Sequence, residues 1–293
     1  MTIVITGATG QLGRLVVEAL LAHNVPAGQI VAAGRDLARA ADLADRGVQL
    51  RVIDYNDPDS LRAAFAGADK VLLISGSEVG QRIEQHRNAI EAARDASVGL
   101  IVYTSIANAD RTDMQLAAEH QATEEALEQS GLPFALLRNG WYLENYTDQL
   151  GTYLQHGAVL GSAGAGRVSA ATRADYAGAA AAVLLLEDQA GKVYELGGDE
   201  PFTLSELAAA VSAASDRPVQ YQDLPAAQYT EALVGAGLPE GYAAILADCD
   251  LGIARGELLV SSGDLSRLIG RPATSMRESV RAAVSAVPSG HGA

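Results

Sequence analysis

Three glycines spaced three residues apart follow a short β-branched run near the beginning of the chain. The run at residues 2–6 leads directly into Gly7-Ala8-Thr9-Gly10-Gln11-Leu12-Gly13, and residues 11–22 have the composition of a helix. Gly7 permits a tight turn, Gly10 leaves room for a pyrophosphate, and Gly13 lets helix and strand pack closely. The helix N-terminus offers N–H groups to an anion. This context predicts a dinucleotide site; a tight turn without a ligand is the alternative.

Apolar runs alternate with Ala- and Leu-rich segments through the first half of the chain. Strands are predicted at residues 2–6, 30–33, 48–53, 70–75, 100–105 and 133–138, and helices at 11–22, 37–46, 59–66, 82–96 and 116–129. Asp36 and Pro58 suit helix starts, and Gly47, Gly67 and Gly131 suit helix ends. Continuous apolar strands alternating with helices predict an α/β fold, a Rossmann-type doubly wound parallel sheet.

The pattern is looser after residue 140. Capping boxes at residues 172–175 and 203–206 open helices, and residues 192–196 suit a late strand. Helices are predicted at 225–236, 240–251 and 275–286, and a loop or hairpin at 157–167. We therefore expect an NADP-binding Rossmann domain at 1–140, a smaller C-terminal α/β lobe for substrate at 141–287, and a disordered tail at 288–293. Late segments can return to the sheet in such an architecture.

Charge and composition exclude several classes of function. The formal net charge is −15, which disfavours nucleic acid and anionic membranes as partners. Cys249 is the only cysteine, so no internal disulfide can form. The histidines make no i, i+4 pair, so we expect no metal, and His86 suits a cap or the surface. No run approaches the roughly 20 apolar residues of a membrane span, which predicts a cytoplasmic protein.

Arg35 stands at the end of the second predicted strand, where an NAD site usually has a carboxylate. A guanidinium there can pair with the 2′-phosphate of NADP(H), whereas Asp36 is better used as a helix cap. Arg14 and Arg39 are possible helpers. The alternative is that Arg35 is a solvated surface residue.

Several longer runs resemble a known family. They are ITGATGQLG at residues 5–13, LLISGSEVGQR at 72–82, HRNAIEAA at 86–93, LRNGWYLENY at 137–146, ATRADYA at 171–177 and KVYELGGD at 192–199. The chain resembles the NmrA-like, atypical branch of the short-chain dehydrogenases/reductases, and within it the bacterial type 2 NAD(P)H:quinone oxidoreductases. The resemblance implies cofactor contacts at Gly7, Ala8, Thr9, Gly10, Gln11, Leu12, Gly13, Arg35, Ser75, Gly76, Ser77, Asn139, Gly140, Trp141, Tyr142, Leu143, Glu144 and Arg173.

The residues themselves are compatible with this implication. Each implied segment follows a predicted strand, and ligands of open parallel sheets bind beyond the carboxyl ends of the strands. Trp141 and Tyr142 offer flat surfaces to an aromatic ring, although core packing explains Trp141 as well. Turn chemistry is likewise an alternative role for Ser75 and Ser77.

The Tyr-x-x-x-Lys pair of the wider superfamily is missing. None of the ten tyrosines has a lysine four positions on, and Ser105 therefore lacks its usual partners. The resemblance places His120 where the atypical branch often has a lysine, which makes His120 and Tyr142 the catalytic candidates. His120 can act as a general acid near neutral pH, or it is simply a half-exposed helix residue. A quinone needs less acid help than a ketone, because its reduced form is a delocalised, weakly basic phenolate.

We therefore expect NADPH-dependent, flavin-independent reduction of quinones or similar electron-poor acceptors by hydride transfer, with a small-molecule substrate and a monomeric or homodimeric protein. One alternative is an NADP(H)-sensing regulatory protein of the NmrA type without turnover. Another is a different enzyme of the branch, acting on imines, enones or sugar nucleotides.

Overall fold

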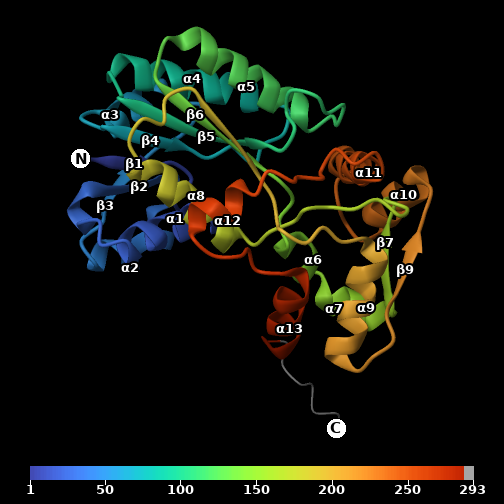
Figure 1. The fold of residues 1–293 in the computed structure, drawn as a ribbon. Coiled ribbons are helices and arrows are strands. Elements are labelled where there is room, and N and C mark those ends of the chain that lie inside the picture. Colours follow the sequence, from blue (N-terminus) through green and yellow to red (C-terminus); the bar gives the residue numbers. More distant parts are fainter. Residues whose placement is uncertain (287–293) are drawn as a thin grey trace.

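Seven parallel strands form the central sheet of the computed structural model, which describes residues 1–286 (Figure 1). The strands are β1 (Ile3–Ile5), β2 (Ile30–Gly34), β3 (Gln49–Val52), β4 (Lys70–Leu73), β5 (Leu100–Ile106), β6 (Phe134–Asn139) and β8 (Lys192–Leu196), in the order β3-β2-β1-β4-β5-β6-β8. In register, Ile3 of β1 lies opposite Ile30 of β2 and Lys70 of β4. The predicted tail at 288–293 lies outside the described residues.

Helices cover both faces of this sheet, which confirms the doubly wound fold (Figure 1). One face carries α1 (Gln11–Ala22), α2 (Ala41–Asp45), α8 (Arg173–Leu185) and α12 (Asp264–Ile269), and the other carries α3 (Pro58–Phe65), α4 (Arg82–Asp95) and α5 (Ala117–Ser130). Each interface is a continuous cluster of buried apolar side chains. The inner strands β1, β2, β4, β5 and β6 are buried on both faces for this reason, whereas the edge strands β3 and β8 are partly exposed.

Late segments return to the sheet after the chain has passed residue 140. β8 pairs in parallel with β6 at the edge of the sheet. α8 packs against α1 on the face of the sheet that also carries α2. α12 packs on α8 and β8. The sheet layer therefore contains residues from both predicted domains.

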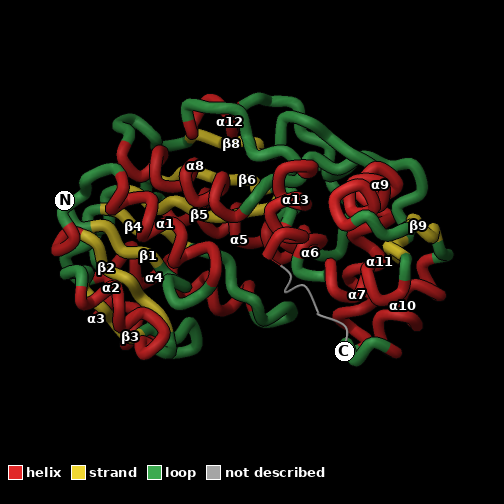
Figure 2. Tube along the Cα trace, turned by 90° about the horizontal axis from the view of Figure 1, so that it is seen from below, coloured by secondary structure: helices red, strands yellow, loops and turns green. Residues whose placement is uncertain are grey.

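The remaining elements form a smaller lobe beside the carboxyl end of the sheet (Figure 2). It contains α6 (Glu144–Thr147), α7 (Leu150–His156), β7 (Ala158–Gly161), α9 (Leu204–Ser215), β9 (Gln220–Asp223), α10 (Ala226–Gly235), α11 (Glu240–Ala254) and α13 (Met276–Ala286). Its own apolar core includes Leu143, Val159, Phe202 and Ile253.

The loop or hairpin predicted at residues 157–167 is wrong in part. Residues 158–161 form β7, which pairs in parallel with β9. A parallel pair needs a long crossover connection and cannot be a hairpin. The partner strand begins at Gln220, so no local pattern marks the pairing.

The helix ends follow their local sequence, with one exception. Gly47, Gly67 and Gly131 adopt the left-handed conformation with φ of +89°, +72° and +74°, as expected for residues that follow helices. The expected helix at 37–46 is instead a 3₁₀ turn, η2 (Leu37–Ala40), followed by the single short helix α2; a second 3₁₀ turn, η1 (Ala27–Gln29), precedes β2.

No helix among residues 1–286 combines the length and the apolar character that crossing a membrane requires.

Candidate nucleotide-binding site

The turn between β1 and α1 has the geometry of a phosphate loop. Gly7 has φ of +60°, and the N–H of Gly10 donates to the carbonyl oxygen of Gly7 at 2.9 Å. A Cβ on Gly13 would lie 2.4 Å from that carbonyl oxygen, so a side chain there would push the helix away from the strand. Gly10 is the N-cap residue of α1, and no side chain caps the helix. The first-turn N–H groups are therefore available to an anion.

A cavity of about 300 Å³ lies beyond the carboxyl ends of β1, β2 and β4. The structure brings together there most of the predicted cofactor residues of the first half of the chain: Gly7, Thr9, Gly10, Gln11, Leu12, Gly13, Arg35, Ser75, Gly76 and Ser77. Ala8 is buried instead, and its N–H donates to the carbonyl oxygen of Ala33 at 3.0 Å. Ala8 thus fastens the loop to β2.

Sequence reasoning missed several residues of the same cavity, namely Gly34, Ile53, Asp54, Tyr55, Ile74, Glu78 and Gln85; Arg39, expected only as a helper, also lines it. A Cβ on Gly34 would lie 2.7 Å from Oγ1 of Thr9, so this glycine makes room for the phosphate loop. The Tyr55 hydroxyl donates to the carbonyl oxygen of Ile74 at 2.7 Å. Asp54 and Tyr55 closely follow the third strand, and this position could have identified them as residues of the site from the sequence.

Arg35 is exposed at the tip of β2 and already has a carboxylate partner. Its Nη1 lies 2.6 Å from Oε1 of Glu78, and Nε2 of Gln85 donates to Oε2 of Glu78 at 3.0 Å. The Gln85 hydrogen bond and the Arg35 charge both lower the pKa of Glu78. The helper Arg14 is paired with Asp42. The Arg35 guanidinium, at the expected position of the 2′-phosphate, is therefore already ion-paired with Glu78.

His86 holds the loop after β4 from the inside. It is fully buried, and burial together with the nearby Arg82 charge lowers its pKa to about 3, so the ring is neutral. Its Nε2 accepts the N–H of Gly76 at 3.0 Å, while Nδ1 donates to Oγ1 of Thr123 at 2.9 Å. The expectation of a cap or surface residue was wrong, because α4 turns this ring toward the sheet.

The segment after β6 lies outside the 300 Å³ cavity and borders the smaller lobe. Asn139 is 5% exposed, and its Oδ1 has no hydrogen-bond partner in the described protein. A Cβ on Gly140 would lie 3.0 Å from the carbonyl oxygen of Ser169, which explains the glycine. The Leu143 side chain belongs to the apolar core of the smaller lobe, so it is not free to contact a ligand.

Tyr142 and Arg173 form one polar cluster at this edge. The Arg173 guanidinium lies 4.7 Å above the Tyr142 ring and 3.6 Å from Oε2 of Glu144. The Glu144 carboxylate also accepts the backbone N–H of Arg173 at 2.9 Å. Burial raises the pKa of Tyr142, so its hydroxyl stays protonated at neutral pH.

His120 is not the half-exposed residue that its sequence suggested. It is 5% exposed, and its Nδ1 lies 2.8 Å from the Tyr103 hydroxyl. Burial, with the charge of Arg82, lowers the pKa of His120 to about 3. Burial therefore favours the neutral imidazole near neutral pH, which argues against a protonated His120 as general acid; its place in catalysis stays a prediction.

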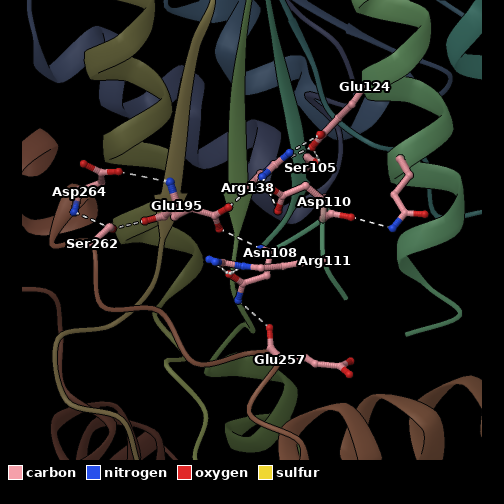
Figure 3. Close-up of polar contacts among 12 residues, drawn as sticks. Ser105, Asn108, Asp110, Arg111, Glu124, Arg138, Glu195, Glu257, Ser262 and Asp264 are labelled. Atoms are coloured by element: carbon pink, nitrogen blue, oxygen red, sulfur yellow. Dashed lines mark hydrogen bonds and ion pairs between the residues drawn. The ribbon is translucent and has the colours of Figure 1, made fainter. Parts of the chain in front are cut away.

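Ser105 takes part in an ion-pair network (Figure 3). Its Oγ donates to Oε1 of Glu124, whose other oxygen lies 2.7 Å from Nη2 of Arg138. Nη1 of Arg138 lies 3.0 Å from Glu195 and 2.9 Å from Asp110. The network ties the ends of β5, β6 and β8 together, so Ser105 has a structural partner. In the part of the chain that the structure describes, no group of three or more His, Cys, Asp or Glu residues is arranged to hold a metal ion.

The parallel sheet, the uncapped glycine turn and the cavity beyond the strand ends define a dinucleotide-binding protein of the Rossmann type. Residues 1–251 match the model of the NmrA-like family. This chain belongs to the NmrA-like family, which confirms the resemblance seen in the sequence.

Several known proteins are similar to this chain over almost its whole length. Quinone oxidoreductase 2 of Escherichia coli (strain K12) is 50% identical, over 95% of this chain and 97% of its own length. A crystal structure of an NADPH-dependent quinone oxidoreductase of Escherichia coli complexed with NADPH has a TM-score of 0.92 at 50% identity, covering 95% of this chain and 98% of that one. Triphenylmethane reductase of Citrobacter sp. complexed with NADP(H) has a TM-score of 0.91 at 42% identity, covering 96% and 100%.

Proposed function

We propose that this chain is an NADPH-dependent reductase that transfers two electrons to quinones or similarly electron-poor acceptors without a flavin. The observation that carries the proposal is the cavity where the phosphate loop and Arg35 meet beyond the sheet. The 50% identity to an Escherichia coli protein named quinone oxidoreductase 2 supports the choice of acceptor.

The residues of the cavity fit the proposed cofactor. Gly7 to Leu12 would hold the pyrophosphate, because a bare turn and an uncapped helix start lie there. Arg35 would hold the 2′-phosphate, and the loop Ser75–Ser77 would lie along the ribose. When bound, NADPH supplies a hydride, which carries both electrons to the acceptor.

Within residues 1–286, neither catalytic candidate is a charged acid near neutral pH. His120 is neutral, whereas the Tyr142 hydroxyl remains protonated and can donate a hydrogen bond to the acceptor oxygen. A reduced quinone is a weakly basic phenolate, so the residues need mainly to position the ring and exclude water. Asn139 with its free Oδ1, Gly140 and Trp141 would shape the acceptor side.

The test is oxidation of NADPH by the purified protein with benzoquinone, naphthoquinone and dye acceptors in turn. We expect turnover with the quinones, and no flavin absorbance in the protein. Tight NADPH binding without turnover across the panel would instead support the NADP(H)-sensing regulator. Turnover confined to imines or enones would place the chain with other enzymes of its branch.

We further propose a cytoplasmic monomer or homodimer that does not bind nucleic acid. The net charge of −15 supports this, since an acidic surface repels phosphate backbones. Size-exclusion chromatography with light scattering determines the oligomeric state.

A further inference from the structure

The loop between β4 and α4, residues 74–81, forms one wall of the nucleotide cavity. Residues 74–78 line that cavity, and a Cβ on Gly7 would lie 3.6 Å from the Cβ of Ile74. The loop therefore lies directly opposite the phosphate loop. Its position determines how a cofactor between the two is held.

Buried side chains of other elements hold this loop in place. Two backbone hydrogen bonds close short turns inside it, from Val79 to Ser77 at 3.2 Å and from Gln81 to Glu78 at 3.1 Å. Other N–H groups donate to side chains outside the loop, those of Ile74, Ser75, Gly76 and Gly80 to Thr6, Thr104, His86 and Glu119 in turn. These acceptor residues are at most 8% exposed. The conformation of the loop thus depends on side chains from the sheet, α4 and α5.

Both backbone polar groups of Gly76 are held in this way. Its N–H donates to Nε2 of His86 at 3.0 Å, and its carbonyl oxygen accepts the Nε–H of Arg82 at 2.6 Å. Gly76 lines the cavity, whereas neither Arg82 nor His86 is among the described lining residues. The two side chains therefore fix a residue of the cavity wall without reaching the cavity themselves.

Glu119 of α5 fixes Arg82 and the end of the loop. Its Oε1 accepts the N–H groups of Gly80 at 3.0 Å and of Arg82 at 3.1 Å. Its Oε2 lies 3.8 Å from Nη1 of Arg82, and neither of these two atoms has a hydrogen-bond partner in the described protein. Both side chains are 11% exposed. A buried ion pair with so open a geometry adds little to stability, because desolvation offsets the attraction. The arrangement fits a role in holding the loop better than a role in stabilising the fold.

We propose that Arg82, Glu119 and His86 are positioning residues for the cofactor. They hold the loop through Gly76 and thereby orient the ribose and the nicotinamide that lie along it. The inference rests on the cofactor site of the proposed function. Its test measures binding and fluorescence of the cofactor rather than turnover, so the reductase activity and the positioning role can fail separately.

The double variant Arg82→Met/Glu119→Gln neutralises the ion pair and removes the donor to the carbonyl oxygen of Gly76. The new glutamine oxygen can still accept the N–H groups of residues 80 and 82, so the fold should keep nearly its free energy of unfolding in urea. NADPH and NADH should both bind about three- to tenfold more weakly in calorimetry. Equal losses for the two cofactors would distinguish this effect from that of Arg35→Ala, which concerns the 2′-phosphate alone.

The fluorescence anisotropy of NADPH bound at saturation separates positioning from affinity. A firmly held nicotinamide gives a high anisotropy, and the double variant should lower it, whereas Arg35→Ala should not. Arg94→Met/Glu128→Gln is the matched control, since both residues are exposed on the same helices α4 and α5. It should change neither affinity nor anisotropy. Wild-type anisotropy in the folded double variant, whatever its affinity, would overturn the proposal.

His86→Phe decides the matter if the double variant does not fold. The new ring can keep the edge contacts with Tyr55 and Tyr103, but it offers no acceptor to the N–H of Gly76. The anisotropy of bound NADPH should fall in this variant as well. An unchanged anisotropy would show that holding Gly76 does not orient the nicotinamide, and the proposal would be wrong.

Discussion

Replacing Arg35 with alanine should weaken NADPH binding and leave NADH binding nearly unchanged. A charge-assisted contact to a phosphate contributes roughly 1.5–3 kcal/mol. The gain is smaller here, because the 2′-phosphate must displace Glu78, which lies 2.6 Å from Arg35 in an exposed pair worth about 0–1 kcal/mol. The net loss is therefore about 1–2.5 kcal/mol, or about 5- to 70-fold in the dissociation constant of NADPH.

The same geometry predicts an opposite effect at Glu78. Glu78→Gln removes the competitor for Arg35 and a negative charge beside the phosphate, so NADPH should bind about two- to fivefold more tightly. Glu84→Gln is the matched control, since Glu84 is exposed in the first turn of α4 and does not line the cavity. The Glu84→Gln variant should bind NADPH and NADH with unchanged affinity.

Isothermal titration calorimetry with NADPH and NADH measures both effects at one low salt concentration, and again at high salt. The differences for NADPH should shrink at high salt, since exposed charges are screened. Equal losses for the two cofactors in Arg35→Ala would refute the 2′-phosphate assignment. Weaker NADPH binding in Glu78→Gln would show that Glu78 assists the cofactor rather than competing with it.

Three other outcomes are expected. Gly10→Val should abolish binding of both cofactors in the same titration, because the added side chain fills the approach to the phosphate loop; unchanged binding would make the loop a plain turn. Tyr142→Phe should lower kcat for a quinone about tenfold with KM little changed, and an unchanged kcat would remove Tyr142 from the chemistry. Burial raises the pKa of Asp250 from 3.8 to about 6, so ionisation of its carboxylate costs a folding free energy that grows as the pH rises from about 4 to about 6 and is complete above that. Asp250→Asn should therefore raise the free energy of unfolding in urea by up to about 3 kcal/mol at about pH 8 and by much less at about pH 4. An equal gain at both pH values would contradict the raised pKa.

The sheet and the phosphate loop could be predicted because their sequence patterns lie within short stretches of neighbouring residues. A strand, a glycine turn and a helix start need only the residues of one short segment, so the turn at Gly7 and the close packing at Gly13 could be predicted from the sequence. Arg35 was found in the same way, as the residue that ends a predicted strand. Its place beyond the sheet follows from the parallel topology.

Burial, pairing and cavity shape depend on residues far apart in the chain. His120 has a polar helical sequence around it, yet the fold buries it against the Tyr103 hydroxyl, and this burial, with the charge of Arg82, lowers its pKa. Glu78 meets Arg35 across a separation of 43 residues. A cavity of about 720 Å³ in the smaller lobe needs α6, α7, α10 and α11 packed together. Local propensity carries no information on such contacts, because their free energy arises only when distant segments exclude water from one another.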